Sequence, residues 1–221
     1  MNKGEAGSLY YPVSLDISGR ECVVIGGGPV AYRKVSALLD CGASVAVISH
    51  DICPELGRLE EMGTVRMIRR DYVPGDLEKA FLAIAATGDS EINHKVAAES
   101  RKRRVLVNVV DDPDHSDFIV PSYLRRGDIT IAVSTGGSSP ALSRRIRTGL
   151  EKSFGEEYAS LAVLIGEVRS ELIKKGIKVD GDAWQKVLDL DSMVAMLQEG
   201  RQEEVKTVLL NQLEKAGRGE L

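Results

Sequence analysis

Short apolar segments alternate with segments of helical periodicity over the first 112 residues, and this alternation restricts the possible folds more than any other feature of the chain. Strands are predicted at 21–25, 44–48, 64–69, 81–86 and 105–110. Helices are predicted at 30–41, 53–62 and 89–102, with a short helical turn at 76–79. Nearly all-apolar strands separated by helices are typical of a parallel sheet covered on both faces. The pattern therefore predicts an α/β fold with a Rossmann-type parallel sheet.

The pattern changes after residue 112. Two further strands are predicted at 117–121 and 129–134, and the turn chemistry of residues 125–128, RRGD, favours an antiparallel hairpin between them. Helical periodicity then continues through 140–153, 156–175, 183–189, 191–199 and 201–215. We therefore expect three parts: a dinucleotide-binding domain over 1–113, a small β segment over 114–150 and a C-terminal helical region over 151–221.

Composition argues against several classes of protein. The net charge of −4 argues against wholesale nucleic-acid binding. No apolar run approaches the roughly 18 residues of a membrane helix. The polar N-terminal residues 1–5 are not followed by the apolar core of a secretory signal. Three scattered cysteines without metal-type spacing favour a reduced, cytoplasmic protein; they are Cys22, Cys41 and Cys53. The histidines are equally dispersed, so we predict no metal site, although folding can bring distant ligands together.

A glycine-rich loop follows the first predicted strand. Residues 26–31, GGGPVA, have the form G-x-G-x-x-A between a strand and a helix. Gly26 permits a tight turn, Gly28 lets the backbone approach a pyrophosphate, and Ala31 keeps the helix close to the sheet. The helix N-terminus then offers free N–H groups to phosphates. The alternative is a purely structural glycine turn.

Residues 49–51, Ser49-His50-Asp51, directly follow the second predicted strand. A dinucleotide site usually places an acid here to bind the ribose hydroxyls. Asp51 fits this role, Ser49 can share it, and the absence of arginine favours NAD over NADP. An equally good interpretation makes Asp51 the N-cap of the following helix. His50 is either beside the adenosine or an ordinary surface residue.

Positive charge concentrates in the middle of this acidic chain. Residues 101–150 contain nine basic and five acidic residues, which suggests an anionic partner or simply a solvated surface. Residues 135–140, TGGSSP, lead into a helix that carries Arg144, Arg145 and Arg147. Guanidinium groups bind carboxylates and phosphates through paired hydrogen bonds. From the residues alone, N-capping by Ser139 and a solvated arginine face is the better interpretation.

An aspartate follows the last predicted parallel strand. Asp111 lies within residues 108–113, NVVDDP, and ligands of open α/β sheets gather at this edge. Asp111 is therefore a candidate general base facing the nicotinamide. The alternative is a carboxylate that caps the following turn, which Pro113 favours.

Several blocks of the sequence resemble one enzyme family. These are GGGPVAYRKVSALLDCGA, LAIAAT at 82–87, NVVDDPDHSDFIVPS at 108–122 and AVSTGGSSPALSRRIR at 132–147. They are similar to the dehydrogenase/ferrochelatase part of siroheme synthases, whose stand-alone form is precorrin-2 dehydrogenase. The resemblance covers about residues 9–175. It implies NAD-dependent oxidation of precorrin-2 to sirohydrochlorin, and in some members Fe²⁺ insertion. It also implies a homodimer whose central segment, here 114–150, crosses between subunits.

The resemblance also implies roles for individual residues. The NAD contacts fall on Gly28, Pro29, Val30, His50 and Asp51, to which we add Gly26, Ser49 and Thr87. The catalytic aspartate of the family falls on Asp111. A hydroxyl that is often serine in the family falls on Thr135. With this family in mind, we expect the substrate carboxylates to bind at Thr135, Ser138, Arg144, Arg145 and Arg147, with Arg125 and Arg126 as further candidates.

The resemblance leaves alternative functions open. One is an enzyme that also inserts Fe²⁺, or is mainly a ferrochelatase, and another is a non-catalytic NAD-sensing module. The methyltransferase domain of the fused enzymes is absent from these 221 residues. We therefore expect precorrin-2 to come from a separate methyltransferase, with a separate chelatase possible.

Overall fold

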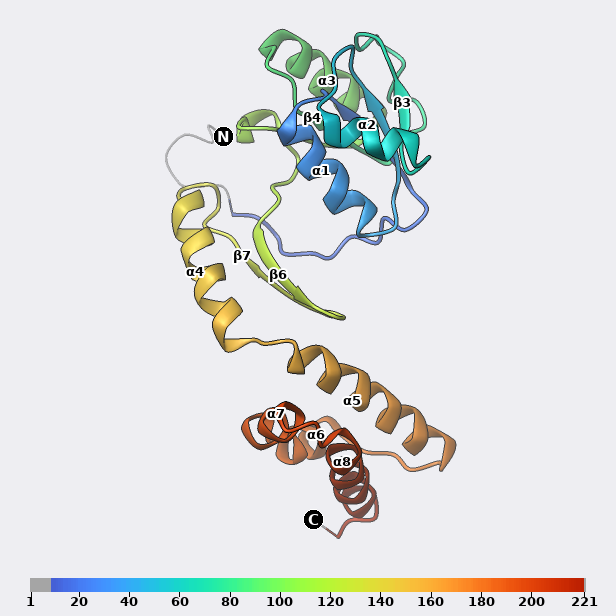
Figure 1. Ribbon diagram of the computed structural model, residues 1–221, viewed down its shortest axis with the longest axis vertical. Coiled ribbons are helices and arrows are strands. Elements are labelled where there is room, and N and C mark those ends of the chain that lie inside the picture. The colour runs from blue at the N-terminus through green and yellow to red at the C-terminus, as the bar shows by residue number, and fades with distance from the viewer. Residues whose placement is uncertain (1–8, 221) are drawn as a thin grey trace. The chain divides into compact units, whose positions relative to one another are not determined.

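The computed structural model describes residues 9–220 (Figure 1). The chain divides into two compact units. The N-terminal unit extends to residue 120 and includes 136–138, and the C-terminal unit comprises 121–135 and the residues from 139 onward.

A five-stranded parallel sheet forms the centre of the N-terminal unit. The strand order is β3-β2-β1-β4-β5, and every neighbouring pair is parallel. The strands are β1 (Glu21–Ile25), β2 (Ser44–Ile48), β3 (Arg66–Ile68), β4 (Leu82–Ala85) and β5 (Leu106–Val109). The predicted Rossmann-type sheet is confirmed. The candidate cofactor residues and Asp111 follow β1, β2, β4 and β5 in the sequence. Because these strands are parallel, all of those residues lie at the carboxyl edge of the sheet.

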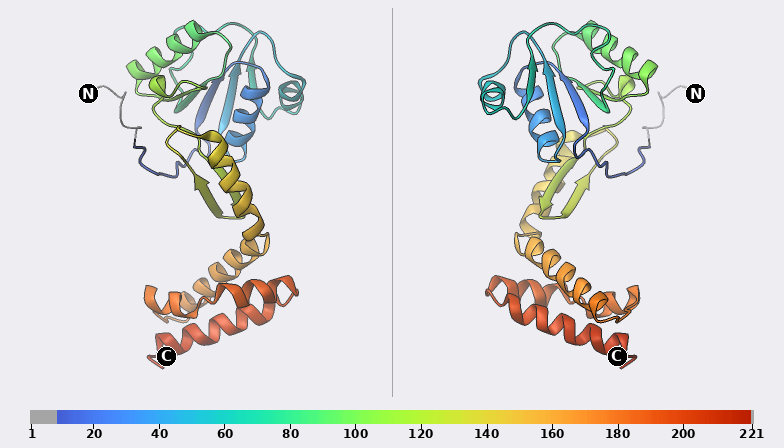
Figure 2. Two further views of the ribbon diagram at one scale, coloured as in Figure 1. Left: turned by 90° about the vertical axis from the view of Figure 1, so that its left-hand side faces the viewer. Right: turned by 90° about the vertical axis from the view of Figure 1, so that its right-hand side faces the viewer.

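Helices cover both faces of this sheet (Figure 2). One face packs against α1 (Pro29–Leu39) and α2 (Pro54–Glu61), and the other packs against α3 (Ser90–Arg103). Alternate residues of each strand enter opposite cores. Val24 of β1 packs with Val35 of α1, whereas its neighbour Val23 packs with Val96 of α3. Burial on both faces explains why the strands are almost entirely apolar.

A buried carboxylate fastens α3 to the loop before β4. Glu99 is 9% exposed and accepts hydrogen bonds from Gly75 N at 3.0 Å, Arg103 Nε at 2.5 Å and the Tyr72 hydroxyl. Burial on its own raises the pKa of Glu99, but these hydrogen bonds outweigh it and hold the pKa below its usual value. Ionised Glu99 therefore stabilises the folded N-terminal unit.

The C-terminal unit begins with an antiparallel hairpin of β6 (Ser122–Arg126) and β7 (Ile129–Val133). The hairpin was predicted, but the strand expected at 117–121 is wrong because the first strand begins at Ser122. Residues 117–118 instead bond to β5, with Asp117 N donating to Val107 O at 2.8 Å. Gly127 adopts a φ of 54°, which a two-residue hairpin turn requires.

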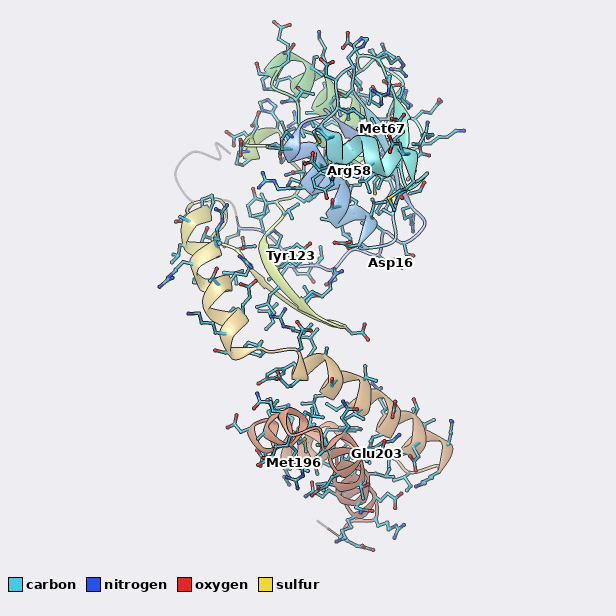
Figure 3. All side chains as sticks on the ribbon, in the orientation of Figure 1. Asp16, Arg58, Met67, Tyr123, Met196 and Glu203 are labelled. Carbon is cyan, nitrogen blue, oxygen red and sulfur yellow. The ribbon has the colours of Figure 1, made fainter. Side chains whose placement is uncertain are left out.

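Five helices complete the C-terminal unit. Their apolar faces form a separate core in which Leu164, Val168, Leu209 and Leu213 are buried, and Met196, labelled in Figure 3, packs against it. In the second of these helices, Leu161, Leu164, Val168 and Leu172 form one buried apolar face. The last helix buries one face in this core. The helices are α4 (Pro140–Ser153), α5 (Glu157–Lys174), α6 (Gly181–Val187), α7 (Leu190–Gln198) and α8 (Gln202–Gly217).

Among the described residues, no helix combines the length and apolar character that crossing a bilayer requires. Cys22 is buried, and this burial raises the pKa of its thiol to about 11. Cys22 therefore packs as a neutral thiol in the sheet.

Candidate functional site

The glycine loop between β1 and α1 contains three glycines with different constraints. A Cβ on Gly26, whose φ is 118°, would lie 2.4 Å from Ala86 O. A Cβ on Gly27 would lie 1.9 Å from Asp51 O, whereas a Cβ on Gly28 would meet nothing within 4 Å. Gly28 has a φ of −82°, which any residue adopts. The protein's own packing therefore requires Gly26 and Gly27, while Gly28 leaves open space in front of the helix.

The N-terminus of α1 is suited to an anionic group. Pro29 occupies the first turn, no side chain caps the helix, and the first turn contains no acidic residue. The first N–H groups of a helix lack intrahelical partners and attract phosphate. With the space beside Gly28, this arrangement fits the pyrophosphate of a dinucleotide. Val30, in the same turn, is half-buried.

The end of β2 lies directly against the glycine loop. Cys53 N donates to Gly27 O at 2.7 Å, and Ser49 Oγ donates to Asp51 O at 2.7 Å. Cys53 is the N-cap residue of α2, so the interpretation of Asp51 as that N-cap is wrong. The Asp51 side chain is exposed, and its carboxylate has no hydrogen-bond partner within residues 9–220. It is free to bind hydroxyl groups of a ligand.

His50 and Thr87 are positioned differently at this edge. The His50 side chain is 63% exposed, with Nε2 3.7 Å from Asp71 Oδ2. Thr87 follows β4, and its backbone N would lie 3.2 Å from a Cβ on Gly26. Its hydroxyl already bonds to Asn93 Oδ1 at 2.8 Å. Thr87 therefore borders the loop mainly through its backbone.

Asp111 stands at the end of β5 in an unusual conformation. It has a φ of 60° and is exposed. The capping interpretation of Asp111 is wrong, because Asp112 caps the following turn η1 (Pro113–His115) by accepting from His115 N at 3.2 Å. Positive φ at a residue other than glycine costs free energy and often occurs at functional sites. The carboxylate of Asp111 is thus left available at the carboxyl edge of the sheet.

Lys34 of α1 is a site residue that the sequence reasoning missed. Its Nζ donates to Asn108 Oδ1 at 3.4 Å. Burial and the charge of Arg33 lower the pKa of Lys34, while the charge of Asp111 opposes this change. The signal was present, since Lys34 interrupts the stripe of Val30 and Leu38. A lysine in the buried face of a helix beside a glycine loop indicates a polar site at the sheet edge.

The arginine helix α4 belongs to the C-terminal unit. The predicted N-cap is confirmed, because Ser139 Oγ accepts from Leu142 N at 3.3 Å. Arg147 pairs with Glu151 on the same helix. Arg144 and Arg145 are exposed and have no ion-pair partner in the described part of the chain. They are therefore the guanidinium groups of α4 that are available to an anionic ligand.

The loop before α4 holds two predicted substrate residues. Thr135 Oγ1 accepts from Ser139 N at 3.0 Å and lies 3.2 Å from Ser143 Oγ. This hydroxyl therefore has a structural role in the start of α4. Ser138 is exposed.

The hairpin arginines also have structural partners. Arg126 Nε donates to Phe154 O at 2.9 Å and lies 3.2 Å from Glu156 Oε1. The guanidinium carbon of Arg125 lies over the ring of Tyr123, 5.9 Å from the ring centroid; Tyr123 is labelled in Figure 3.

Two of the dispersed histidines come together with a carboxylate. His94 Nε2 lies 3.3 Å from Asp112 Oδ2, and His115 Nδ1 lies 2.7 Å from the same oxygen. No sequence spacing indicated this group, because α3 supplies one histidine and η1 the other.

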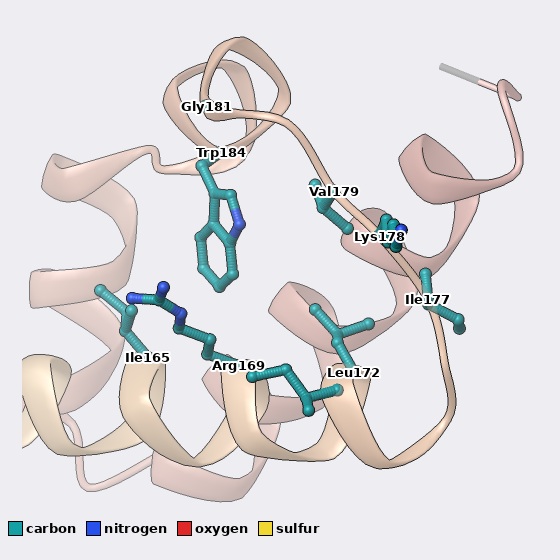
Figure 4. A pocket seen from close by; sticks show the side chains of 9 residues that line it. Ile165, Arg169, Leu172, Ile177, Lys178, Val179, Gly181 and Trp184 are labelled. Carbon is teal, nitrogen blue, oxygen red and sulfur yellow. The ribbon is translucent and has the colours of Figure 1, made fainter.

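A shallow pocket of about 640 Å³ lies within the C-terminal helices (Figure 4). Trp184 of α6 and Arg169 of α5 point into it from opposite sides, and Leu172 and Val179 also line it. No residue predicted from the sequence to bind cofactor or substrate lines this pocket.

Two family models match successive parts of the chain. A family described as "Putative NAD(P)-binding" matches residues 13–122, and one described as "Sirohaem biosynthesis protein central" matches residues 126–153. The siroheme synthase of Thioalkalivibrio sulfidiphilus is 35% identical over 207 residues, which are 93% of this chain and 42% of that protein. The siroheme synthase of Methylococcus capsulatus is 36% identical over 214 residues, which are 96% of this chain and 45% of that protein. The chain thus spans less than half the length of these relatives.

A solved structure titled "SirC, precorrin-2 dehydrogenase" matches the fold. Its TM-score is 0.74 at 27% identity, and the match covers 93% of this chain and 100% of that chain. Residues 13–122 thus match a family of putative NAD(P)-binding proteins, residues 126–153 match a family of sirohaem biosynthesis proteins, and the fold of the chain is similar to that of a precorrin-2 dehydrogenase.

Proposed function

We propose that this protein oxidises precorrin-2 to sirohydrochlorin with NAD⁺ as the electron acceptor. The observation that carries the proposal is the match to a precorrin-2 dehydrogenase, which covers 93% of this chain and 100% of that chain. The site supports it independently, because an open glycine loop and an unpaired aspartate lie at one edge of the same parallel sheet. Such an edge is where open α/β sheets bind their ligands.

The cofactor site would be formed by the ends of β1, β2 and β4. Gly26 and Gly28, with Pro29 and Val30, would hold the pyrophosphate at the start of α1. The free carboxylate of Asp51 would accept hydrogen bonds from the ribose, which favours NAD over NADP. Ser49 would hold this loop in place through its own hydrogen bond. His50 and Thr87 would border the bound nucleotide. When bound, NAD⁺ supplies the hydride-accepting ring.

Asp111 would act on the proton that leaves the substrate. Loss of a hydride and a proton from precorrin-2 requires a base or a negative charge near the ring carbon. The exposed carboxylate of Asp111 is unpaired within the described chain and is held at the sheet edge by its backbone conformation. Lys34 would place a positive charge at this edge of the sheet, and its hydrogen bond to Asn108 would orient its side chain.

The substrate has several carboxylate side chains, and α4 carries matching charge. We assign Arg144 and Arg145 as the main anchors, since both are exposed and unpaired within residues 9–220. Arg147 would have to leave Glu151 to contribute. Ser138 would donate a hydrogen bond, and Thr135 would shape the loop that presents it.

We further propose a homodimer in which the segment 114–150 mediates assembly, alongside a cofactor domain over 1–113 and a helical region over 151–221. A reducing, cytoplasmic location would be consistent with three cysteines that are scattered along the sequence without metal-type spacing. Precorrin-2 would be supplied by a separate methyltransferase, and a separate chelatase would complete the pathway if this protein does not insert Fe²⁺.

The role of Asp111 is tested with Asp111→Asn, because asparagine tolerates positive φ and removes only the charge. We expect unchanged NAD⁺ affinity and the loss of most precorrin-2 turnover. Asp114→Asn is the matched control, since Asp114 is an exposed acid of the adjoining turn. Unchanged turnover in Asp111→Asn would remove Asp111 from the mechanism. Incubation with sirohydrochlorin and Fe²⁺ in the absence of NAD⁺ separately tests metal insertion.

A further inference from the structure

We propose that His94, Asp112 and His115 form a binding site for one divalent transition-metal cation of the Zn²⁺ or Co²⁺ type. The three ligand atoms, one from each side chain, all lie within 4.8 Å of one another. Two imidazole nitrogens and one carboxylate oxygen form a ligand set that suits these metals. The site is additional to the dinucleotide loop and does not depend on precorrin-2 oxidation.

The separations between ligand atoms are close to those of a coordinated metal. With metal–ligand bonds of about 2.0–2.1 Å, tetrahedral ligand atoms lie about 3.3 Å apart. The distance from His94 Nε2 to Asp112 Oδ2 is 3.3 Å. The distance from His115 Nδ1 to the same oxygen is 2.7 Å, so this pair would open by about 0.6 Å. Side-chain rotation supplies such a change, since His115 and Asp112 are 37% and 28% exposed.

The protein holds these side chains before any metal arrives. Asp112 Oδ1 accepts from His115 N at 3.2 Å, which leaves Oδ2 facing both imidazoles. The buried Ser116 hydroxyl donates to the backbone oxygen of Asp112 at 2.8 Å and accepts from Val109 N at 2.9 Å. The two imidazole rings lie 4.2 Å apart between centroids. The backbone of η1 and the end of β5 therefore hold Asp112 and His115 in place, and α3 brings His94 beside them.

The site is also accessible. The His94 side chain is 51% exposed on α3, so the cluster is open to solvent on one side. Three protein ligands with an open position are typical of zinc sites that bind water or another ligand. A bound cation would lie at Asp112, the residue next to Asp111, at the carboxyl edge of the sheet.

The proposal is tested with metal-free protein in the absence of nucleotide and tetrapyrrole. Co²⁺ is titrated under reducing conditions and followed by visible absorption, and Zn²⁺ is titrated by calorimetry. We expect one equivalent of each metal to bind, with Co²⁺ d–d bands and no thiolate charge-transfer band. An excess of Mg²⁺ should not compete, because Mg²⁺ prefers all-oxygen ligands.

Two variants and one control assign the ligands. His94→Ala and Asp112→Asn should each lower the affinity at least about tenfold. His94 is on an exposed helix face, so its replacement leaves the fold intact even if Asp112→Asn loosens η1. His50→Ala is the control and should bind metal like the wild type. His50 also lies near a carboxylate, that of Asp71, but among the described residues it is not part of a group with a second histidine. No binding of Co²⁺ or Zn²⁺, equal affinity in His94→Ala and the wild type, or a thiolate band would overturn the proposal.

Discussion

Replacing Gly28 by alanine tests whether this glycine is required for NAD⁺ binding or for the stability of the fold. A Cβ on Gly28 meets no atom within 4 Å, whereas a Cβ on the neighbouring Gly27 would lie 1.9 Å from Asp51 O. If the dinucleotide pyrophosphate approaches the loop at Gly28, the new methyl group occupies its place. Gly28→Ala should therefore weaken NAD⁺ binding without affecting stability, and Gly27→Ala should affect both.

The magnitudes follow from the backbone. Gly28 is the N-cap of α1 with φ −82° and ψ −177°, which alanine also adopts. Alanine gains about 0.4–1 kcal/mol by restricting the unfolded chain and loses roughly 0.5–1 kcal/mol as a poorer N-cap. The two effects offset each other to within about 0.5 kcal/mol. In Gly27→Ala the loop must move by about 1 Å, which costs at least about 2 kcal/mol.

Chemical denaturation and NADH fluorescence titration measure the two effects on the same samples. We expect Gly28→Ala to unfold within about 0.5 kcal/mol of the wild type and to lose at least tenfold in affinity, about 1.4 kcal/mol. Wild-type affinity in Gly28→Ala would refute the placement of the pyrophosphate. A loss of more than about 2 kcal/mol of stability in the same variant would refute the claim that the space beside Gly28 is open.

Two further predictions concern stability. Glu99→Gln should lower the free energy of unfolding at neutral pH by about 1–3 kcal/mol. Because the pKa of Glu99 is lowered in the folded protein, Glu99 contributes to stability above about pH 4.3, and this contribution is lost as the pH falls through the folded pKa. The free energy of unfolding of Glu99→Gln should therefore fall less steeply in acid than that of the wild type, as measured by denaturation at several pH values. Parallel pH dependence in the two proteins would contradict this. Leu209 is fully buried, so Leu209→Ala should lower the free energy of unfolding by about 2–5 kcal/mol. Unfolding is monitored by the fluorescence of Trp184, the single tryptophan, and an unchanged denaturation midpoint would contradict the prediction.

Periodicity predicted most elements because the physical cause is local. The strands at 21–25 and 44–48 and the helix at 140–153 have the bounds expected from their apolar pattern and flanking Gly or Pro. The strand expected at 117–121 failed for a nonlocal reason. Its apolar residues precede Pro121, and its first residue is held to β5 by two hydrogen bonds. Asp117 N donates to Val107 O, and Val107 N donates to Asp117 Oδ2. Nothing in residues 117–121 alone reveals that partner.

The candidate site was predictable in type more than in detail. The glycine pattern indicated the loop, but only the contact between Gly27 and Asp51 distinguishes packing glycines from the open one. Consecutive aspartates obscured the cap, which is Asp112 and not Asp111. The pairing of His94 with Asp112 depends on how α3 packs beside β5, and sequence separation carries no information about it.

The most direct test of the account is an anaerobic assay in which precorrin-2 is generated in situ by a separate methyltransferase. NADH formation and sirohydrochlorin absorbance are recorded together, with NADP⁺ as the comparison. The account predicts one NADH for each sirohydrochlorin, a preference for NAD⁺, and no product when both nucleotides are omitted. Failure to form sirohydrochlorin with either NAD⁺ or NADP⁺ would contradict it.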